Sequence, residues 1–361
     1  MNEPIGVAVL GCGYWGINYV RVFDQVPGAR VVVACDQRPE RLAEVKRQVP
    51  GVAITDSVEE MLATPGVDAV VVCTPATGHF AVTSQCIAAG KHILVEKPIA
   101  TTVAESDELI RQADARGVLL MVGHTFVYNA GVRKVKEYLD ADEIGTVYYL
   151  YSRRTNLGPI RHDVNALWDL APHDISIFNF LLDSVPEWVS AVGARVLQNG
   201  REDVGFISLG YPDGVVAHVH VSWADPHKVR EVVVVGSEKR IVFNDLLTPE
   251  QVKVFEKGIA PAPPEAPSYG EYHFTVRDGA IISPRIDVSE PLKTQSRHFL
   301  ECIATGSTPL TDGRAGRDVV AVLEAIDRSI AKQGAPVDVE WGRLYDYSAR
   351  RNAARLSETA N

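Results

Sequence analysis

The glycine-rich turn Gly11-x-Gly13-x-x-Gly16 constrains the fold of this chain more than any other feature of the sequence. It follows the apolar run of residues 5–10 directly and opens a helix-like segment, and Asp36 ends the next apolar run. A glycine turn alone is a weak signal, but strand, turn, helix, strand and terminal acid in this order predict a dinucleotide-binding βαβ unit. Gly13 would let the backbone approach a pyrophosphate, Gly16 would let helix pack on strand, and the helix N-terminus would offer N–H groups to the phosphates. The alternative is a structural turn that binds nothing.

The residues around the turn bear on which dinucleotide binds. Asp36 is suited to accept hydrogen bonds from the ribose hydroxyls and to repel a 2′-phosphate, which favours NAD. Arg38 leaves NADP as the alternative, because a guanidinium there either binds a 2′-phosphate or covers the adenine ring. Tyr14 and Trp15, inside the turn, complete the predicted cofactor contacts at this end.

Hydrophobic periodicity predicts the architecture of the first third of the chain. Up to about residue 123, short β-branched runs alternate with amphipathic segments, which is typical of a doubly wound parallel sheet with strands buried on both faces. Ser57 and Glu60 have the spacing of a capping box, and Gly90 and Gly117 stand where helices should end. We therefore expect an α/β protein with an N-terminal Rossmann domain at residues 1–124.

The remainder of the chain has a different texture. After a helix expected at 131–139, strand-like runs dominate, and Pro212-Asp213-Gly214 predicts a hairpin turn. The proline-rich segment 258–270 is interpreted as a loop. We expect a C-terminal α+β domain at 125–345, built on a large open, mostly antiparallel sheet and used for substrate binding and oligomerisation, and a tail at 346–361.

Composition excludes several classes of protein. The 36 basic and 46 acidic residues give a formal net charge of −10, which argues against a nucleic-acid surface. The five cysteines form no CxxC pair and show no metal-ligand spacing, so reduced, buried thiols and no metal site are expected. We see neither a signal-like segment nor an apolar stretch of membrane-span length, and we expect a cytoplasmic protein without membrane contact.

Two motifs stand where the fourth and fifth apolar runs end. Thr74-Pro75, with His79 nearby, follows the fourth run, and Glu96-Lys97, continued by a proline, follows the fifth. Doubly wound sheets bind ligands at the carboxyl ends of their strands, so these residues are predicted to contact the cofactor. A Lys-Pro pair after a strand is also a common structural event, in which the proline stops the strand and the lysine is solvated.

Asp169 and His173 are four residues apart in a segment, 167–182, whose apolar spacing predicts a helix, so they share one face of it. Pro172 is tolerated only in the first turn of a helix, which would place both polar side chains at the helix N-terminus. The alternative is that Asp169 caps the helix and His173 is a surface imidazole.

Positive charge gathers just before this helix, in the segment 153–162, where Arg154, Asn156 and Arg161 are candidate substrate contacts. Bidentate guanidinium binding suits carboxylates and phosphates, so we expect an anionic substrate. An exposed strand end with surface ion pairs is an equally good interpretation of these arginines.

The motifs together resemble the Gfo/Idh/MocA oxidoreductases, which act on sugars, sugar nucleotides and cyclitols. The resemblance rests on the glycine turn, the Thr-Pro and Glu-Lys-Pro motifs and Asp169-x-x-x-His173, and it covers nearly the whole chain. It implies a Rossmann domain joined to a domain whose open sheet commonly mediates homodimers or homotetramers. The chain departs from the family pattern at Ala76 and at 124–129, where Tyr128 and Asn129 are candidate substrate contacts in place of arginines.

By this resemblance, Lys97, Asp169 and His173 stand at the family's catalytic positions. Oxidation of an alcohol needs a base that takes the hydroxyl proton while hydride leaves for the nicotinamide, and a neutral imidazole suits that task. We assign His173 as the base, Lys97 as the group that orients the hydroxyl and relays its proton, and Asp169 as their partner.

The segment 168–175 resembles the version of the motif found in UDP-N-acetylglucosaminuronate 3-dehydrogenases of surface-polysaccharide pathways. Such a substrate carries a pyrophosphate and a carboxylate, in agreement with the arginines. An inositol- or glucose-type polyol dehydrogenase is one alternative. A dinucleotide-binding regulator without catalysis is another, since a Rossmann fold does not require an enzyme.

Overall fold

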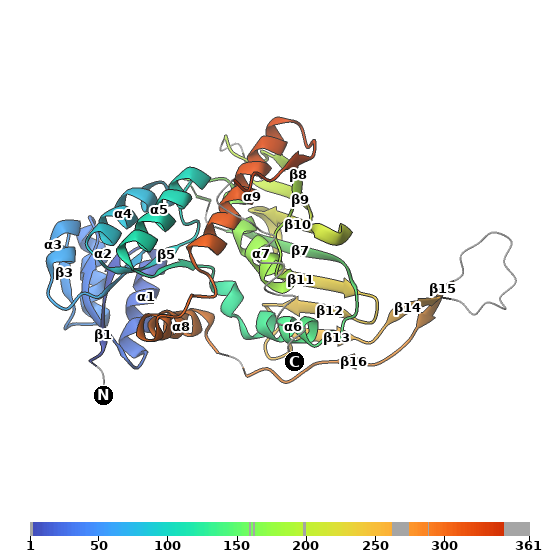
Figure 1. Cartoon of the computed structure of the whole chain (residues 1–361), viewed down its shortest axis with the longest axis horizontal. Helices are drawn as coiled ribbons and strands as arrows, with labels where there is room; N and C mark the ends of the chain where they lie inside the picture. Colours follow the sequence, from blue (N-terminus) through green and yellow to red (C-terminus); the bar gives the residue numbers. More distant parts are fainter. Residues whose placement is uncertain are drawn as a thin grey trace, which may run out of the picture. The chain divides into compact units, whose positions relative to one another are not determined.

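The computed structural model describes residues 3–158, 160–161, 163–197, 200–261, 274–287 and 289–342 (Figure 1). The chain divides into two compact units that alternate along the sequence. The first unit comprises Met1–Lys134, Pro159–Ser176 and Arg285–Val320, and the second comprises Val135–Gly158, Ile177–Pro284 and Ala321–Asn361. The expected domain boundary at 124/125 stays a prediction, and the expected tail at 346–361 lies outside the described residues.

A parallel sheet forms the centre of the first unit, in the order β3-β2-β1-β4-β5-β6. All of its neighbouring strands run parallel, which confirms the predicted doubly wound sheet. Chain order reverses between β1 and β4, and ligands of such sheets bind beyond the carboxyl ends of the strands at this point. The strands are β1 (Ile5–Leu10), β2 (Ala29–Cys35), β3 (Ala53–Thr55), β4 (Ala69–Val72), β5 (His92–Glu96) and β6 (Leu120–Gly123).

Helices connect these strands. Their buried side chains, among them Met61, Ile87 and Leu109, pack with Val70, Val95 and other strand residues in one apolar core. The helices are α1 (Tyr14–Gln25), α2 (Pro39–Gln48), α3 (Val58–Ala63), α4 (His79–Ala88) and α5 (Val103–Arg116), with short 3-10 turns η1 (Ala76–Gly78) and η2 (Thr125–Tyr128).

Local signals set several of these boundaries. The Ser57 side chain accepts a hydrogen bond from the Glu60 N–H at 3.2 Å and so caps α3 as expected. Gly117 ends α5 in the left-handed conformation, at φ +67°. The later helices are α6 (Ala130–Asp140), α7 (Ala166–Leu182), α8 (Pro291–Thr305) and α9 (Gly313–Ala331). Within the described ranges, no helix has the length and apolar character needed to cross a membrane.

The second unit is built on a nine-stranded sheet in the order β16-β13-β12-β11-β7-β10-β9-β8-β17. Among the strands that the structure describes in this sheet, only β7 and β10 pair in parallel, so the predicted open, mostly antiparallel sheet is confirmed. The strands are β7 (Val147–Leu157), β8 (Trp188–Ala194), β9 (Val204–Gly210), β10 (Val216–Ser222), β11 (Ala224–Gly236), β12 (Arg240–Asn244), β13 (Val252–Phe255), β16 (Ile281–Ile282) and β17 (Val337–Asp338).

One expectation about this unit is wrong in part. The segment 258–270 was interpreted as a loop because of its prolines, but its first residues form β14 (Gly258–Pro261), which pairs with β15 (Phe274–Arg277). Proline is tolerated at the end of a strand, and the partner that stabilises β14 lies beyond the proline-rich stretch. Residues 262–270 lie outside the described part of the chain.

Candidate active site

The three glycines of the first turn have different structural roles. Gly11 has a φ of +89°, and a Cβ on it would lie 2.8 Å from the main chain of Cys73. A Cβ on Gly16 would lie 1.8 Å from the Gly11 carbonyl oxygen. A Cβ on Gly13 would meet nothing nearer than the Arg38 guanidinium, at 3.7 Å. The fold itself therefore requires Gly11 and Gly16, whereas Gly13 leaves an open space beside the backbone.

That open space lies at the start of α1. Gly13 is the N-cap residue, and no described side chain caps the helix, so its first N–H groups can receive an anion. Tyr14 and Trp15 are 77% and 42% exposed, although both are large and aromatic. The turn thus fits a dinucleotide pyrophosphate, with two exposed rings beside it.

Asp36, at the end of β2, is 6% exposed. It forms hydrogen bonds both to the glycine turn and to Arg38. Its carboxylate accepts a hydrogen bond from the Cys12 N–H at 2.7 Å and two from the Arg38 side chain, each at 3.0 Å. Burial opposes the charged form, but the hydrogen bonds from Arg38 and Cys12 hold the pKa of Asp36 below its usual range. The Arg38 guanidinium is therefore engaged by Asp36.

Replacing Asp36 by alanine is expected to shift cofactor preference toward NADP. The change removes the negative charge that repels a 2′-phosphate and releases the Arg38 guanidinium to bind one. A hydrogen bond to a charged group contributes about 1.5–3 kcal/mol, so the ratio of NADP to NAD affinity should rise about tenfold or more. Fluorescence titration with both dinucleotides measures this ratio. An unchanged ratio would contradict the assignment of Asp36 as the ribose-binding acid.

The Thr-Pro motif follows β4, as predicted. The Thr74 hydroxyl oxygen is buried and has no hydrogen-bond partner among the described residues, and Pro75 is exposed beside it. Both ring nitrogens of His124, which follows β6, are buried and equally without a described partner. Burial and the Lys97 charge lower the pKa of His124 to about 3, so its ring is neutral. Buried polar atoms normally have partners, so these two residues offer hydrogen-bonding capacity to a ligand at the carboxyl ends of the strands.

Glu96 is buried behind the site. Its carboxylate accepts a hydrogen bond from the Tyr19 hydroxyl at 2.7 Å, and that hydroxyl accepts one from the Gln295 amide, also at 2.7 Å. Burial raises the pKa of Glu96. These contacts make Glu96 a support of the loop that carries Lys97. Sequence reasoning missed Tyr19 and Gln295, because nothing local marks them as partners of a residue so distant in the chain.

Lys97 and Asp169 meet, as the resemblance implied. The Lys97 ammonium donates to the main-chain oxygen of Asp169 at 2.7 Å and to its carboxylate at 3.2 Å. Arg161 donates to the same carboxylate oxygen at 3.2 Å and holds Asp163 through two further hydrogen bonds, at 2.9 and 2.5 Å. Burial opposes ionisation, but Lys97 and Arg161 keep the pKa of Asp169 below its usual value. The result is a cluster of two cations and two anions, in which sequence reasoning missed Asp163.

The helix that carries Asp169 differs from the expectation. α7 (Ala166–Leu182) contains Pro172 in its second turn, so the prediction that Pro172 lies in the first turn is wrong. Asp169 is in the first turn, and His173 lies one turn further along. An internal proline removes one helical hydrogen bond and crowds the carbonyl four residues earlier, here that of Trp168. The next carbonyl along the helix, that of Asp169, receives the Lys97 ammonium.

His173 extends the site along the same face of α7. Its ring makes an edge-on contact with Phe126, with ring centroids 5.0 Å apart. Spacing of four residues places His173 beside Asp169 on the helix surface. The proposed base therefore belongs to the same unit of the fold as the Lys97 cluster.

The other candidate substrate residues lie in differing surroundings. Tyr128 is buried and its hydroxyl lies 3.1 Å from that of Thr311, and Asn129 accepts a hydrogen bond from the Gly131 N–H at the start of α6. Arg154 is buried on β7, and Asn156 is half-buried on the same strand, both in the second unit. Their roles in substrate binding remain predictions.

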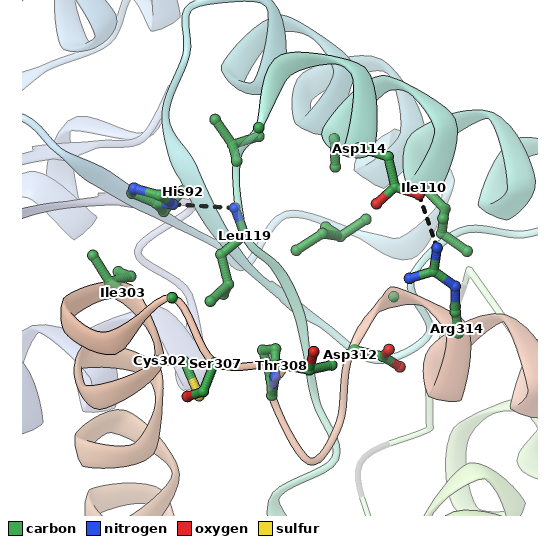
Figure 2. A pocket seen from close by; sticks show the side chains of 17 residues that line it. His92, Ile110, Asp114, Leu119, Cys302, Ile303, Ser307, Thr308, Asp312 and Arg314 are labelled. Atoms are coloured by element: carbon green, nitrogen blue, oxygen red, sulfur yellow. Dashed lines mark hydrogen bonds and ion pairs between the residues drawn. The ribbon is translucent and has the colours of Figure 1, made fainter. Parts of the chain in front are cut away.

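A separate cavity of about 310 Å³ lies in the first unit, where β5 and β6 begin (Figure 2). Its lining includes His92, Asp312, and an ion pair of 2.8 Å between Arg314 and Asp114. Glu96 is the last residue of β5, and Lys97 follows it, at the opposite, carboxyl end of the strand. This cavity is therefore distinct from the candidate active site.

Comparison with known proteins agrees with this geometry. Residues 5–124 match the oxidoreductase family with an NAD-binding Rossmann fold, and residues 132–242 match the GFO/IDH/MocA C-terminal domain. The chain is 27% identical to scyllo-inositol 2-dehydrogenase (NAD(+)) from Bacillus subtilis, over 96% of this chain and 99% of that protein. It is 29% identical to UDP-N-acetylglucosamine 3-dehydrogenase from Acidithiobacillus ferrooxidans, over 87% of this chain and 93% of that protein.

A solved structure has the same fold over nearly its full length. The crystal structure of GenD2 from gentamicin A biosynthesis, in complex with NAD, is 26% identical and has a TM-score of 0.79, covering 94% of this chain and 97% of that one. Both family matches and these full-length similarities lead to the same assignment. The chain belongs to the Gfo/Idh/MocA family of oxidoreductases.

Proposed function

We propose that this protein oxidises a hydroxyl-bearing carbon of a sugar with NAD as the hydride acceptor. The observation that carries the proposal is the buried ion pair between Lys97 and Asp169. Lys97 lies directly after β5, at the end of the strands where doubly wound sheets bind their ligands. A charged pair buried at such a position is unusual unless it serves a site. The relatives named above are dehydrogenases, which favours an enzyme over the alternative of a non-catalytic regulator.

The residues of the cluster have complementary tasks in this proposal. Within the described part of the chain, the side-chain ammonium of Lys97 makes two hydrogen bonds, both to Asp169. One of its three N–H donors is therefore left for a substrate oxygen. Lys97 thereby orients the hydroxyl, and Asp169 fixes Lys97. His173 takes the hydroxyl proton, since a neutral imidazole is an effective base near neutral pH. Bound NAD supplies the acceptor for the hydride.

The finer proposal is a UDP-N-acetylglucosaminuronate 3-dehydrogenase. It is supported by the similarity to a UDP-N-acetylglucosamine 3-dehydrogenase and by the arginines that precede α7. Of these, Arg161 already holds two carboxylates, so a substrate anion would have to compete with Asp163 or Asp169 for it. Arg154, which is buried on β7, is the other candidate for binding an anionic group. A polyol dehydrogenase is the second candidate, favoured by the full-length similarity to an inositol dehydrogenase.

A substrate panel with matched arginine variants separates the two candidates. Purified protein is assayed with UDP-N-acetylglucosaminuronate, UDP-N-acetylglucosamine and scyllo-inositol, with NAD or NADP, by absorbance of the reduced nicotinamide. We expect turnover of the nucleotide sugar acid, and we expect Arg154→Ala to raise its KM about tenfold through loss of a charge-assisted hydrogen bond.

Arg153→Ala is the control, because Arg153 is exposed on the other face of β7. Turnover of scyllo-inositol alone would replace the nucleotide-sugar proposal by the polyol one. An equal KM in wild type and Arg154→Ala would contradict the proposal that Arg154 binds an anionic group of the substrate. Arg161→Ala is less suitable for this test, since it also disturbs Asp169 and should lower kcat for every substrate.

A further inference from the structure

His79, the first residue of α4, is 1% exposed, and both of its ring nitrogens contact main-chain oxygens. Nδ1 lies 2.7 Å from the carbonyl oxygen of Pro98, and Nε2 lies 2.8 Å from that of Thr74. Thr74 belongs to the loop after β4, and Pro98 directly follows Lys97 after β5. The imidazole therefore spans the loops at the ends of two neighbouring parallel strands.

The protons on this ring can be counted. A carbonyl oxygen only accepts hydrogen bonds, and a neutral imidazole carries a single N–H. Both contacts are hydrogen bonds only when both nitrogens are protonated. We propose that His79 is a positively charged clamp that holds the Thr74 loop and the Lys97 loop at a fixed spacing. The ring does not reach the cofactor in this role, so His79 is a positioning residue and not the direct cofactor contact expected from the sequence.

The charges around the ring act in both directions. Burial, the largest effect, lowers the pKa of His79. The two carbonyl contacts and the Asp163 charge raise it, the Arg161 charge lowers it, and the net result is a pKa below the ordinary value of histidine. The two contact distances favour the charged ring, because a neutral ring would face one carbonyl oxygen with a nitrogen lone pair at 2.7 or 2.8 Å. Asp163 offers the nearby negative charge that a buried imidazolium requires.

Loss of one proton has a defined consequence. One of the two hydrogen bonds becomes a repulsive contact between two acceptors, and the loops that carry Thr74 and Lys97 are no longer held together. Since the pKa of His79 lies below its ordinary value, this loss is expected as pH rises through the acidic range, before neutrality is reached. NAD affinity should then fall, because Thr74 and Lys97 border the site predicted for the cofactor. The importance of Lys97 here rests on the proposed function, whereas the charge of His79 does not.

Nitrogen-15 NMR of protein labelled at its histidines tests the charge directly. At pH 5, on the acid side of an ordinary histidine pKa, long-range ¹⁵N–¹H correlation is expected to show His79 with both nitrogens protonated, its signal being identified by its loss in His79→Gln or His79→Asn. His92 is an internal control, because its Nδ1 accepts a hydrogen bond from the Leu119 N–H at 3.1 Å and must be unprotonated. A His79 signal with one bare nitrogen at pH 5 would overturn the proposal.

A binding measurement tests the positioning role without any sugar substrate. The Kd for NAD, read by tryptophan fluorescence, is expected to rise about tenfold in wild type between pH 5 and pH 8 and to be high and nearly independent of pH in His79→Gln. A merely structural role for His79 would raise Kd by the same factor at every pH, and that result would contradict the clamp. If the Kd for NAD depends on pH as expected but the protein turns over no sugar, only the proposed function is contradicted.

Discussion

Replacing His173 by alanine is expected to lower kcat for sugar oxidation by about 10²- to 10⁴-fold, with NAD affinity close to that of wild type. The imidazole is assigned as the base that takes the hydroxyl proton, and removing a general base leaves only water to do so. NAD binding should persist, because the nucleotide turn and Asp36 belong to other elements of the fold. Stopped-flow absorbance of the reduced nicotinamide measures the oxidation step, and fluorescence titration measures NAD affinity.

The acid side of the pH profile gives a second readout for the same variant. A base must be unprotonated to act, so wild-type kcat should fall as the pH is lowered, and this fall should be absent in His173→Ala. His227→Ala is the matched control, because His227 is exposed on β11 in the second unit. If kcat in His173→Ala equals that of wild type, His173 is not the base.

Replacing Gly16 by alanine is expected to have the largest effect on the fold of the nucleotide turn. The new Cβ would lie 1.8 Å from the Gly11 carbonyl oxygen, so the backbone of the turn must move. Forced overpacking of this kind destabilises proteins by about 1–3 kcal/mol and occasionally by more. Urea unfolding measures the loss of stability, and NAD binding should be lost with the geometry of the turn.

Gly13→Ala is the control that separates binding from folding. Its Cβ would meet nothing nearer than 3.7 Å, and its φ of −69° is suitable for alanine. Stability should be unchanged or raised by about 0.4–1 kcal/mol, because alanine reduces the freedom of the unfolded chain. NAD affinity should nevertheless fall, since the methyl group fills the space beside the backbone. Normal NAD binding by Gly13→Ala would mean that the pyrophosphate does not approach the backbone there.

The features that sequence predicted well are those set by local physical chemistry. The β-branched runs of the first unit become parallel strands, and short-range capping rules correctly place the start of α3 at Ser57 and the end of α5 at Gly117. The pairing of Lys97 with Asp169 came from the family resemblance rather than from spacing, since 72 residues separate them. The structure then supplied the contact that the resemblance implied.

The features that sequence did not predict depend on contacts between distant segments. Tyr19 and Gln295 hold Glu96 from positions 77 residues and more away in the chain. The strand β14 forms because a partner beyond the proline-rich stretch is available. Pro172 was placed in a first turn by a rule about isolated helices, and packing around α7 overrides that rule.

The main-chain contact between Lys97 and α7 has a consequence for how the site responds to charge. In the folded protein the Asp169 carbonyl already receives the Lys97 ammonium at 2.7 Å, so this dipole is oriented before any substrate arrives. In water, solvent dipoles would have to rotate each time a proton moved near this ammonium. Here folding has already oriented the dipole, so the reorganisation energy that accompanies proton transfer at Lys97 is lowered.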